Sequence, residues 1–248
     1  MKTNRLDLSS AALHILAMLF MLCDHLWGTI IPGNQWLTNI GRLAFPIFAF
    51  LIVEGYTHTK NLRRYVLRLL LFAILSEIPF NLMLSGRVFN PVHQNVLWTF
   101  LIGLWLIHIN EQARKKEKVW LTLLTAAGTL ALGMLLGTLT MVDYYGAGVA
   151  TGLVFYFFRG RRWWNLAGQI LALHYLYTEV IGGLYFEVEL FGTTVEIVQQ
   201  SLALFALIPI WIYRGRQGYH ARWFRLFSYL FYPVHMLFLW LIGRYLLQ

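Results

Sequence analysis

The stretch LSSAALHILAMLFMLCDHLWGTII, from Leu8 to Ile31, decides the fold class. It is long enough to cross a bilayer as one helix, which needs ~20 mainly apolar residues. Lys2 and Arg5 precede it as in a signal peptide, but no small-residue cleavage site follows, so we interpret it as a retained span. Asp24 and His25 interrupt it, and ionisable residues within a span usually mark a functional site.

The composition of the whole chain agrees with a membrane protein. Hydrophobic residues make up 58% of the 248 residues and charged residues 12%, whereas soluble domains carry about 25% charged residues. The net charge of +9 is spread over short basic clusters between apolar runs, so nucleic acid is not an expected partner. The single cysteine, Cys23, excludes an internal disulfide framework.

The apolar runs predict an all-α, polytopic membrane helix bundle of about nine transmembrane helices, in one domain over residues 1–248. The predicted spans are residues 8–31, 38–58, 62–84, 93–110, 119–137, 142–158, 162–181, 193–213 and 224–247. With this count, 17 of the 20 Lys and Arg residues fall on one side of the membrane, and the other side keeps only Arg42, Arg87 and Arg244. Because basic loops stay in the cytoplasm, the N-terminus is expected to be cytoplasmic.

Asp24 and His25 lie in the outer half of the first span by this topology. Neighbours in a helix point about 100° apart, so each side chain is expected to meet a partner on another helix. Histidine titrates near neutrality and suits a general base. The alternative is a hydrogen-bonding pair that only joins helices.

The second predicted span, GRLAFPIFAFLIVEGYTHT, contains Arg42 and Glu54. Pro46 cannot donate a backbone hydrogen bond to the carbonyl of Arg42, which predicts a kink beside a cation. Either charge would be costly if unpaired in lipid. Both are therefore candidate substrate-binding residues.

Three arginines, Arg63, Arg64 and Arg68, open the third predicted span on its cytoplasmic side. Such a cluster could hold the phosphates of a soluble cofactor. The alternative is that the positive charges only set the orientation of the helix.

Further candidates for substrate binding lie at helix ends and beside prolines. They are Glu77 and Asn81, one turn apart around Pro79, and His93, Gln94, Asn95, Asp143, Tyr144 and His235. Polar residues at a helix start can equally be caps. Pro233 in the segment YPVH predicts a break in the last span beside His235. No metal site is predicted, because no HExxH or paired-cysteine motif occurs.

At these residues the chain resembles the TraX family of membrane proteins. The resemblance rests on the DH of the first span and on GRLAFPIFAFLIVEGYTHTKN (41–61), RYVLRLLLFAILSEIPFN (64–81) and QNVLWTFLIGL (94–104), while DYYG and YPVH fit more loosely. TraX proteins are associated with N-acetylation of conjugative pilin. They are grouped with acyltransferase-3 proteins and heparan-glucosaminide N-acetyltransferase, so the resemblance implies an acyltransferase of the bacterial inner membrane.

The resemblance also implies roles for the candidate residues. Acetyl-CoA would be the cytoplasmic acyl donor, and an amine or hydroxyl of a small molecule, glycan or peptide the acceptor. His25 would be the catalytic base, with Asp24 orienting it or binding the acceptor, while Arg63, Arg64 and Arg68 would bind CoA. Two alternatives stay open: a transporter that uses the buried charges as a relay, and a pilus or membrane assembly factor. Membrane lipids are expected partners, and the oligomeric state is left open.

Overall fold

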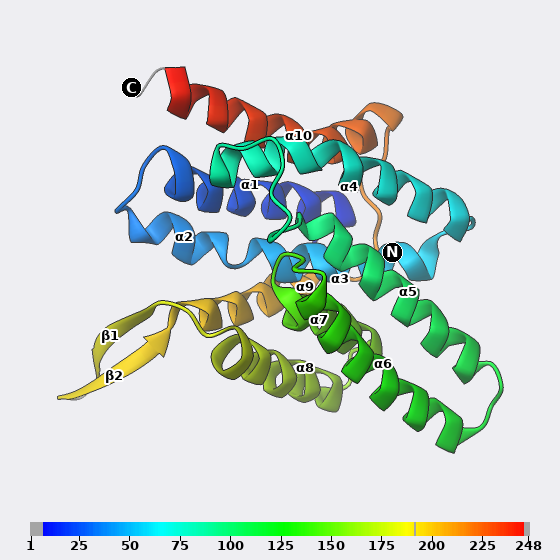
Figure 1. Ribbon diagram of the computed structural model, residues 1–248. Coiled ribbons are helices and arrows are strands. Elements are labelled where there is room, and N and C mark those ends of the chain that lie inside the picture. Colours follow the sequence, from blue (N-terminus) through cyan, green and yellow to red (C-terminus); the bar gives the residue numbers. More distant parts are fainter. Residues whose placement is uncertain (1–6, 191, 246–248) are drawn as a thin grey trace. The chain divides into compact units, whose positions relative to one another are not determined.

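The computed structural model describes residues 7–190 and 192–245, and it is mostly helical (Figure 1). Its helices are α1 (Ser10–Thr29), α2 (Gln35–Gly41), α3 (Ala44–His58), α4 (Leu62–Ser85), α5 (Val96–Arg114), α6 (Val119–Leu139), α7 (Tyr145–Phe157), α8 (Trp163–Tyr175), α9 (Leu207–Ile212) and α10 (Arg222–Tyr245). A π-helical segment, Leu176–Ile181, continues α8, and a 3-10 helix, Gln199–Ala206, precedes α9. Two antiparallel strands, β1 (Tyr185–Leu190) and β2 (Thr193–Val198), form a hairpin.

The chain divides into two compact units. Unit 1 comprises Met1–Leu51 and Ile170–Gln248, and unit 2 comprises Ile52–Gln169. In unit 1, α1 packs against both α2 and α10, and the 3-10 helix contacts α2 and α9. In unit 2, α5 packs against α4, α6 and α7, and α6 also packs against α7. The prediction of a single domain over the whole chain stays a prediction.

Local sequence signals place several helix ends. Ser9 Oγ accepts the backbone N–H of Ala12 at 3.2 Å and caps α1. Asn61 Oδ1 accepts the N–H of Arg64 at 2.9 Å and caps α4, which ends at Gly86 in the left-handed region (φ 66°). These are the residue types that helix termini favour, because they satisfy backbone groups that lack a partner inside the helix.

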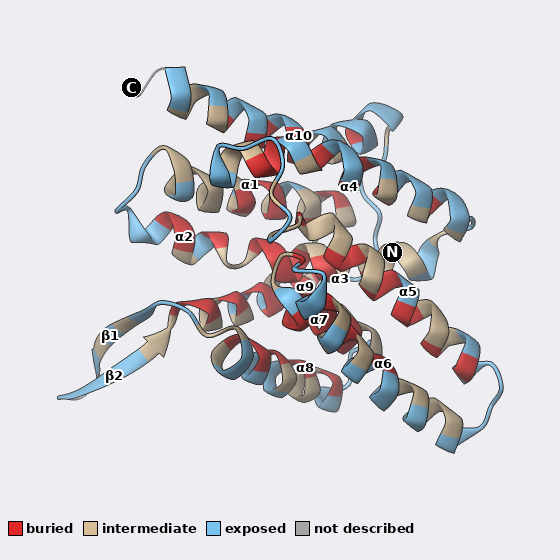
Figure 2. Cartoon of the chain, in the orientation of Figure 1, coloured by how far each residue is buried: buried red, intermediate tan, exposed pale blue. Residues whose placement is uncertain are grey.

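Five helical stretches in the described part of the chain are long and apolar enough to cross a membrane. They are Ser10–Thr29, Gln35–His58, Leu62–Ser85, Val119–Leu139 and Arg222–Tyr245. Large apolar side chains stand exposed along α4, α6 and α10, as expected of surfaces that face lipid (Figure 2). The structure therefore supports a membrane helix bundle, but it does not confirm a count of nine spans.

The predicted span over residues 193–213 is wrong as a single helix. It begins with strand β2, continues as the 3-10 helix and ends with the short helix α9. The same hairpin means that the fold is not all-α. Residues 185–190 and 193–198 are rich in β-branched and aromatic residues, and Gly192 turns the chain with φ 78°. The apolar content of residues 193–213, considered alone, predicts a helix.

The second predicted span consists of two helices. The chain leaves α2 after Gly41 and starts α3 at Ala44, so Arg42 lies at the junction. Pro46 sits in the first turn of α3, where its missing N–H does not interrupt a helical hydrogen bond. The kink predicted from Pro46 thus takes the form of a helix boundary. Pro233, by contrast, lies inside α10, which runs on without the predicted break.

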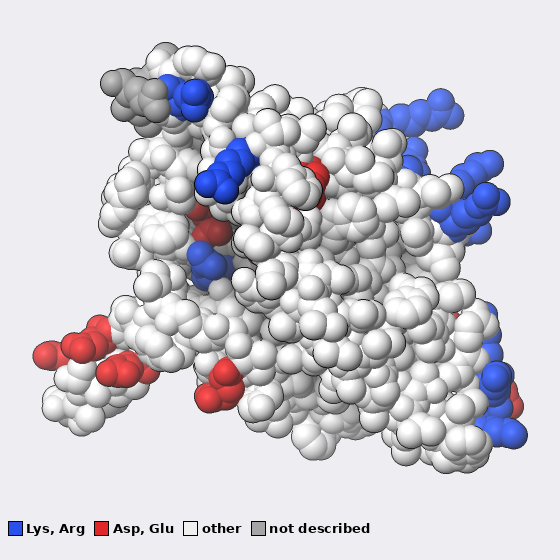
Figure 3. All heavy atoms as spheres, in the orientation of Figure 1, with Lys and Arg blue, Asp and Glu red and all other residues white. Residues whose placement is uncertain are grey.

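Charged side chains gather at separate places on the surface. The exposed acidic residues Glu187, Glu189 and Glu196 lie on the β1–β2 hairpin (Figure 3). Within unit 2, Lys and Arg residues gather where α4 begins and in the loop between α5 and α6 (Figure 3). Both of these basic groups lie on the side of the membrane that the sequence predicts to be cytoplasmic. Lys2, Arg5 and the end of the span predicted to close at residue 247 lie outside the described residues.

Candidate functional site

An ion pair between Asp24 of α1 and Arg42 forms the centre of a polar cluster in unit 1. Arg42 Nη2 donates to Asp24 Oδ1 at 2.9 Å, and the two side chains keep 20% and 22% of their surface exposed. Each charge therefore has an opposite charge as its partner, which lowers the cost of placing both within a membrane helix bundle. The sequence predicted both residues as site members but not their pairing.

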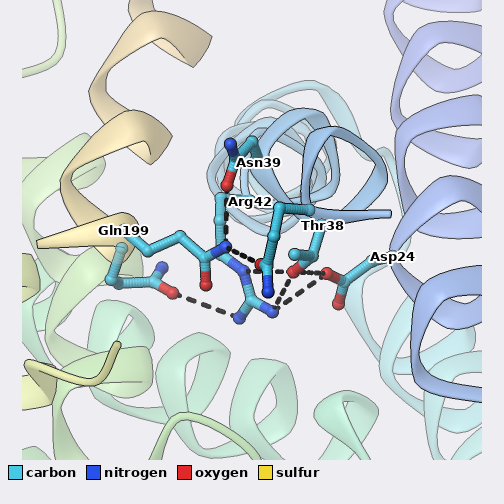
Figure 4. Close-up of polar contacts among 7 residues, drawn as sticks. Asp24, Thr38, Asn39, Arg42 and Gln199 are labelled. Atoms are coloured by element: carbon cyan, nitrogen blue, oxygen red, sulfur yellow. Dashed lines mark hydrogen bonds and ion pairs between the residues drawn. The ribbon is translucent and has the colours of Figure 1, made fainter. Parts of the chain in front are cut away.

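Two residues that the sequence did not identify, Thr38 and Gln200, also belong to this cluster, and Figure 4 shows Thr38 beside Asp24 and Arg42. The hydroxyl of Thr38 donates to Asp24 Oδ1 at 2.7 Å and accepts from Arg42 Nη2 at 2.7 Å. Gln200 Oε1 accepts from Arg42 Nη1 at 3.3 Å, and Gln200 itself is 4% exposed. The only feature of the sequence that points to Thr38 and Gln200 is that they are uncharged polar residues in apolar runs.

Gly41 allows α2 to approach α1 closely at this cluster. A Cβ atom at residue 41 would lie 2.7 Å from Asp24 Oδ1, closer than real Cβ contacts come. A side chain here would therefore displace Asp24 or separate the helices. Gly41 thus contributes to the Asp24–Arg42 pair through its lack of a side chain, which single-sequence analysis did not identify.

His25 of α1 forms a hydrogen bond to His235 of α10. His25 Nδ1 lies 2.7 Å from His235 Nε2, and the two rings are within 5° of parallel. His25 is half-buried and His235 is 7% exposed. The expectation that Asp24 and His25 meet partners on other helices is confirmed, because Asp24 contacts α2 residues while His25 contacts α10.

The hydrogen bonds determine the tautomers of both imidazoles. His235 Nδ1 lies 2.6 Å from the backbone carbonyl of Phe231, which can only accept, so Nδ1 carries the proton. His235 Nε2 is then the acceptor for a proton on His25 Nδ1. In this neutral arrangement His25 Nε2 is left with its lone pair, which is the state a general base requires.

In unit 2, Glu77 of α4 accepts two hydrogen bonds from α5. The amide of Asn95 donates to Glu77 Oε2 and to the carbonyl of Ala73, and Trp98 Nε1 donates to Glu77 Oε2 at 3.0 Å. Asn95 also caps α5 through its Oδ1. The alternative interpretation of Asn95 as a helix cap is therefore correct, while its role in substrate binding stays a prediction. Trp98 was missed, since it resembled the other interfacial aromatics of the sequence.

The loops that contain His93 and Asp143 lie together in unit 2. His93 Nε2 is 3.3 Å from Asp143 Oδ1, and Gln94 pairs with Val142 in a short parallel bridge. The hydrogen bond that His93 donates to Asp143 raises the pKa of His93, with the charges of Asp143 and Glu77 adding to the increase and burial opposing it. Tyr144, the next residue, adopts a left-handed backbone with φ 60°, which is uncommon outside glycine.

The structure gives Asn81 and Glu54 partners that the sequence did not identify. The amide of Asn81 donates to the carbonyl of Val88 at 3.3 Å. Glu54 Oε1 accepts from Arg159 at 3.0 Å within unit 2. Sequence spacing placed these residues on suitable helix faces, but it could not reveal which neighbouring element supplies the partner.

The predicted cofactor residues Arg63, Arg64 and Arg68 stand exposed in the first turns of α4, and none forms an ion pair with a described residue. They are accessible to a soluble anion. No group of three or more His, Cys, Asp or Glu is placed to hold a metal ion among the residues the structure describes.

Comparison with known proteins gives two matches. Residues 9–243 match the protein family described as TraX protein. The chain is also similar to the probable fimbrial assembly protein FimC, serogroup H1, of Dichelobacter nodosus, with 25% identity over 249 residues that cover 94% of this chain and 95% of that protein. No solved structure matches the chain significantly. Because the family match extends over nearly the whole sequence, this chain belongs to the TraX family.

Proposed function

We propose that this protein is a component of fimbria or pilus assembly in the bacterial inner membrane. The observation that carries the proposal is the similarity to a probable fimbrial assembly protein, which covers nearly the full length of both chains. Five helices suited to crossing a membrane support the location. The assembly role takes precedence over the other interpretations of the sequence because it is the one that a relative's name supports.

The assembly role is tested by deleting the gene that encodes this chain in its own host. We expect surface fimbriae to disappear, as measured by electron microscopy and by immunoblotting of sheared surface protein. A plasmid copy of the wild-type gene should restore them. Normal fimbriation in the deletion strain, with the loss of the protein verified, would contradict the proposal.

A second candidate function is acyl transfer, and the His25–His235 hydrogen bond favours it. With Nδ1–H donated to His235, His25 Nε2 would take the proton from an amine or hydroxyl as that group attacks the thioester carbonyl of acetyl-CoA. The new N–C or O–C bond forms as the C–S bond breaks, and CoA leaves as a thiolate that recovers the proton from His25. The acetyl group is transferred without oxidation or reduction.

The other charged residues would assist this reaction. Arg42, held by Asp24 and Thr38, would supply a fixed positive group for the oxyanion that forms on the thioester carbonyl. Arg63, Arg64 and Arg68 would bind the phosphates of CoA, since guanidinium groups pair strongly with phosphate oxygens. Acetylation of an assembly substrate would join the two candidate functions.

The acyl-transfer candidate is tested with purified protein, labelled acetyl-CoA and candidate acceptors. The His25→Ala variant should lose transfer by a factor of about 100 or more, because the general base is removed. His14→Ala is the matched control: His14 lies on the same helix, and its Nδ1 is hydrogen-bonded to the backbone carbonyl of Ser10. A folded His25→Ala variant with wild-type activity would exclude His25 as the base.

The fimbriation assay separates the two candidate functions. If His25→Ala restores fimbriae fully in the deletion strain, the assembly role stands and needs no acyl transfer by His25. The transporter interpretation stays a prediction, and uptake into proteoliposomes without acyl-CoA would support it.

A further inference from the structure

Unit 2 contains a polar face whose hydrogen bonding is incomplete. It lies on α4 and is centred on Glu77 and Asn81, which stand one turn apart and so share one side of the helix. The acyl-transfer candidate uses neither residue as base or CoA ligand. The incomplete hydrogen bonding therefore calls for an explanation of its own.

Two oxygen atoms on this face lack a hydrogen-bond donor among the described residues. Glu77 Oε2 accepts from Asn95 and Trp98, but Glu77 Oε1 is buried and has no hydrogen-bond partner among the described residues. Asn81 donates its amide to Val88, but its Oδ1 is also buried and finds no donor in the described part of the chain, and the residue is only 1% exposed. Both groups can only accept when Glu77 is ionised. Buried acceptors without donors are rare in proteins, so these two need an explanation.

The charge on this face favours a positive partner. Glu77 forms no ion pair with any described Lys or Arg. Among the described residues His93 is hydrogen-bonded to Asp143 and not to Glu77. An ionised Glu77 therefore has no ion-pair partner among the described residues.

Among the described residues, no group of three or more His, Cys, Asp or Glu is placed to hold a metal ion, so Glu77 belongs to no metal site of that kind. An ammonium group needs fewer ligands, because it is a compact charge with three N–H donors that carboxylate and amide oxygens accept well.

We propose that the Glu77–Asn81 face of α4 binds a protonated primary amine, which donates hydrogen bonds to Glu77 Oε1 and Asn81 Oδ1. The ammonium group neutralises Glu77 and supplies the donors that the two oxygens lack. Asn95 and Trp98 hold the carboxylate in place from its other oxygen. This binding site does not depend on acyl transfer or on the assembly role.

The test uses the purified full-length protein in detergent with methylammonium chloride as the probe. Tetramethylammonium chloride at equal concentration is the control salt, because it carries the same charge and no N–H donor. We expect methylammonium, but not tetramethylammonium, to raise the midpoint of thermal unfolding in a saturable manner. Glu77→Gln and Asn81→Leu should each weaken the apparent affinity by about tenfold or more. Glu111→Gln should keep the wild-type response, because Glu111 already has Arg114 and Tyr156 as partners in the same unit.

Two results would overturn the proposal. One is an equal response of the wild type, Glu77→Gln and Asn81→Leu to methylammonium, which would place the binding elsewhere. The other is the absence of any response that distinguishes methylammonium from tetramethylammonium in the wild type. If Glu77→Gln does not fold, Asn81→Leu alone decides the comparison.

Discussion

His25 and His235 are hydrogen-bonded through Nδ1 and Nε2 at 2.7 Å, although 210 residues separate them in the sequence. The second bond of His235, to the carbonyl of Phe231 at 2.6 Å, fixes the direction in which this pair donates. His235 therefore acts through His25, and it orients the imidazole that we propose as a base.

Substitutions of His235 should show whether this residue orients the His25 imidazole or only packs against it. His235→Leu is expected to lower the rate of acyl transfer by about 10- to 100-fold, because His25 loses the acceptor that fixes its tautomer. His235→Gln should recover much of the rate, since its side-chain carbonyl can accept from His25 Nδ1. Single-turnover rates with labelled acetyl-CoA measure both variants, and equal losses in the two would argue for a purely structural role.

The Asp24–Arg42 pair should behave as a coupled unit. Asp24→Asn or Arg42→Met alone is expected to lower the free energy of unfolding by about 2–4 kcal/mol, because each leaves an opposite charge without its partner. The double variant should be less destabilised than the sum of the two. Reversible unfolding in mixed detergent measures the cycle.

An exposed ion pair provides the control for this cycle. Arg114 keeps 66% of its side chain exposed while it pairs with Glu111, so the same treatment of that pair should give a coupling of about 1 kcal/mol or less. Additive effects of the Asp24 and Arg42 substitutions would show that their contact does not stabilise the fold.

Gly41→Ala should destabilise unit 1. The new methyl group would meet the side chain of Asp24, and overpacking of this kind costs about 1–3 kcal/mol. Gly28→Ala is the matched control, because an added Cβ there meets nothing within 4 Å and alanine favours the helix. Thermal unfolding monitored by tryptophan fluorescence compares the two. The prediction fails if Gly41→Ala unfolds at the temperature of the wild type.

The His93–Asp143 contact should make stability depend on pH. The folded protein raises the pKa of His93, so protonated His93 stabilises the fold fully below its ordinary pKa of about 6.5. This contribution is lost as the pH rises through the raised value. The wild type should therefore exceed His93→Gln in unfolding temperature by more at about pH 5.5 than at about pH 8.5. A difference that does not change with pH would contradict this assignment.

The apolar runs of the sequence determined the membrane class, because hydrophobic length is a local property. All five long apolar helical stretches begin and end within a few residues of predicted spans, and Asp24, His25 and Arg42 stood out because ionisable groups are rare in such runs. The hairpin at 185–198 escaped prediction because a short apolar run suits strand and helix equally well.

Only the tertiary structure decided which polar groups meet. It joined His25 to His235, added Thr38 and Gln200 to the Asp24–Arg42 pair, and gave Glu54 a partner in Arg159. Helical spacing fixes which residues share a face, but it carries no information about the helix that covers that face. Side-chain partners between distant segments depend on how the helices pack, and that packing follows from the complementary shapes and polar groups of all the elements together.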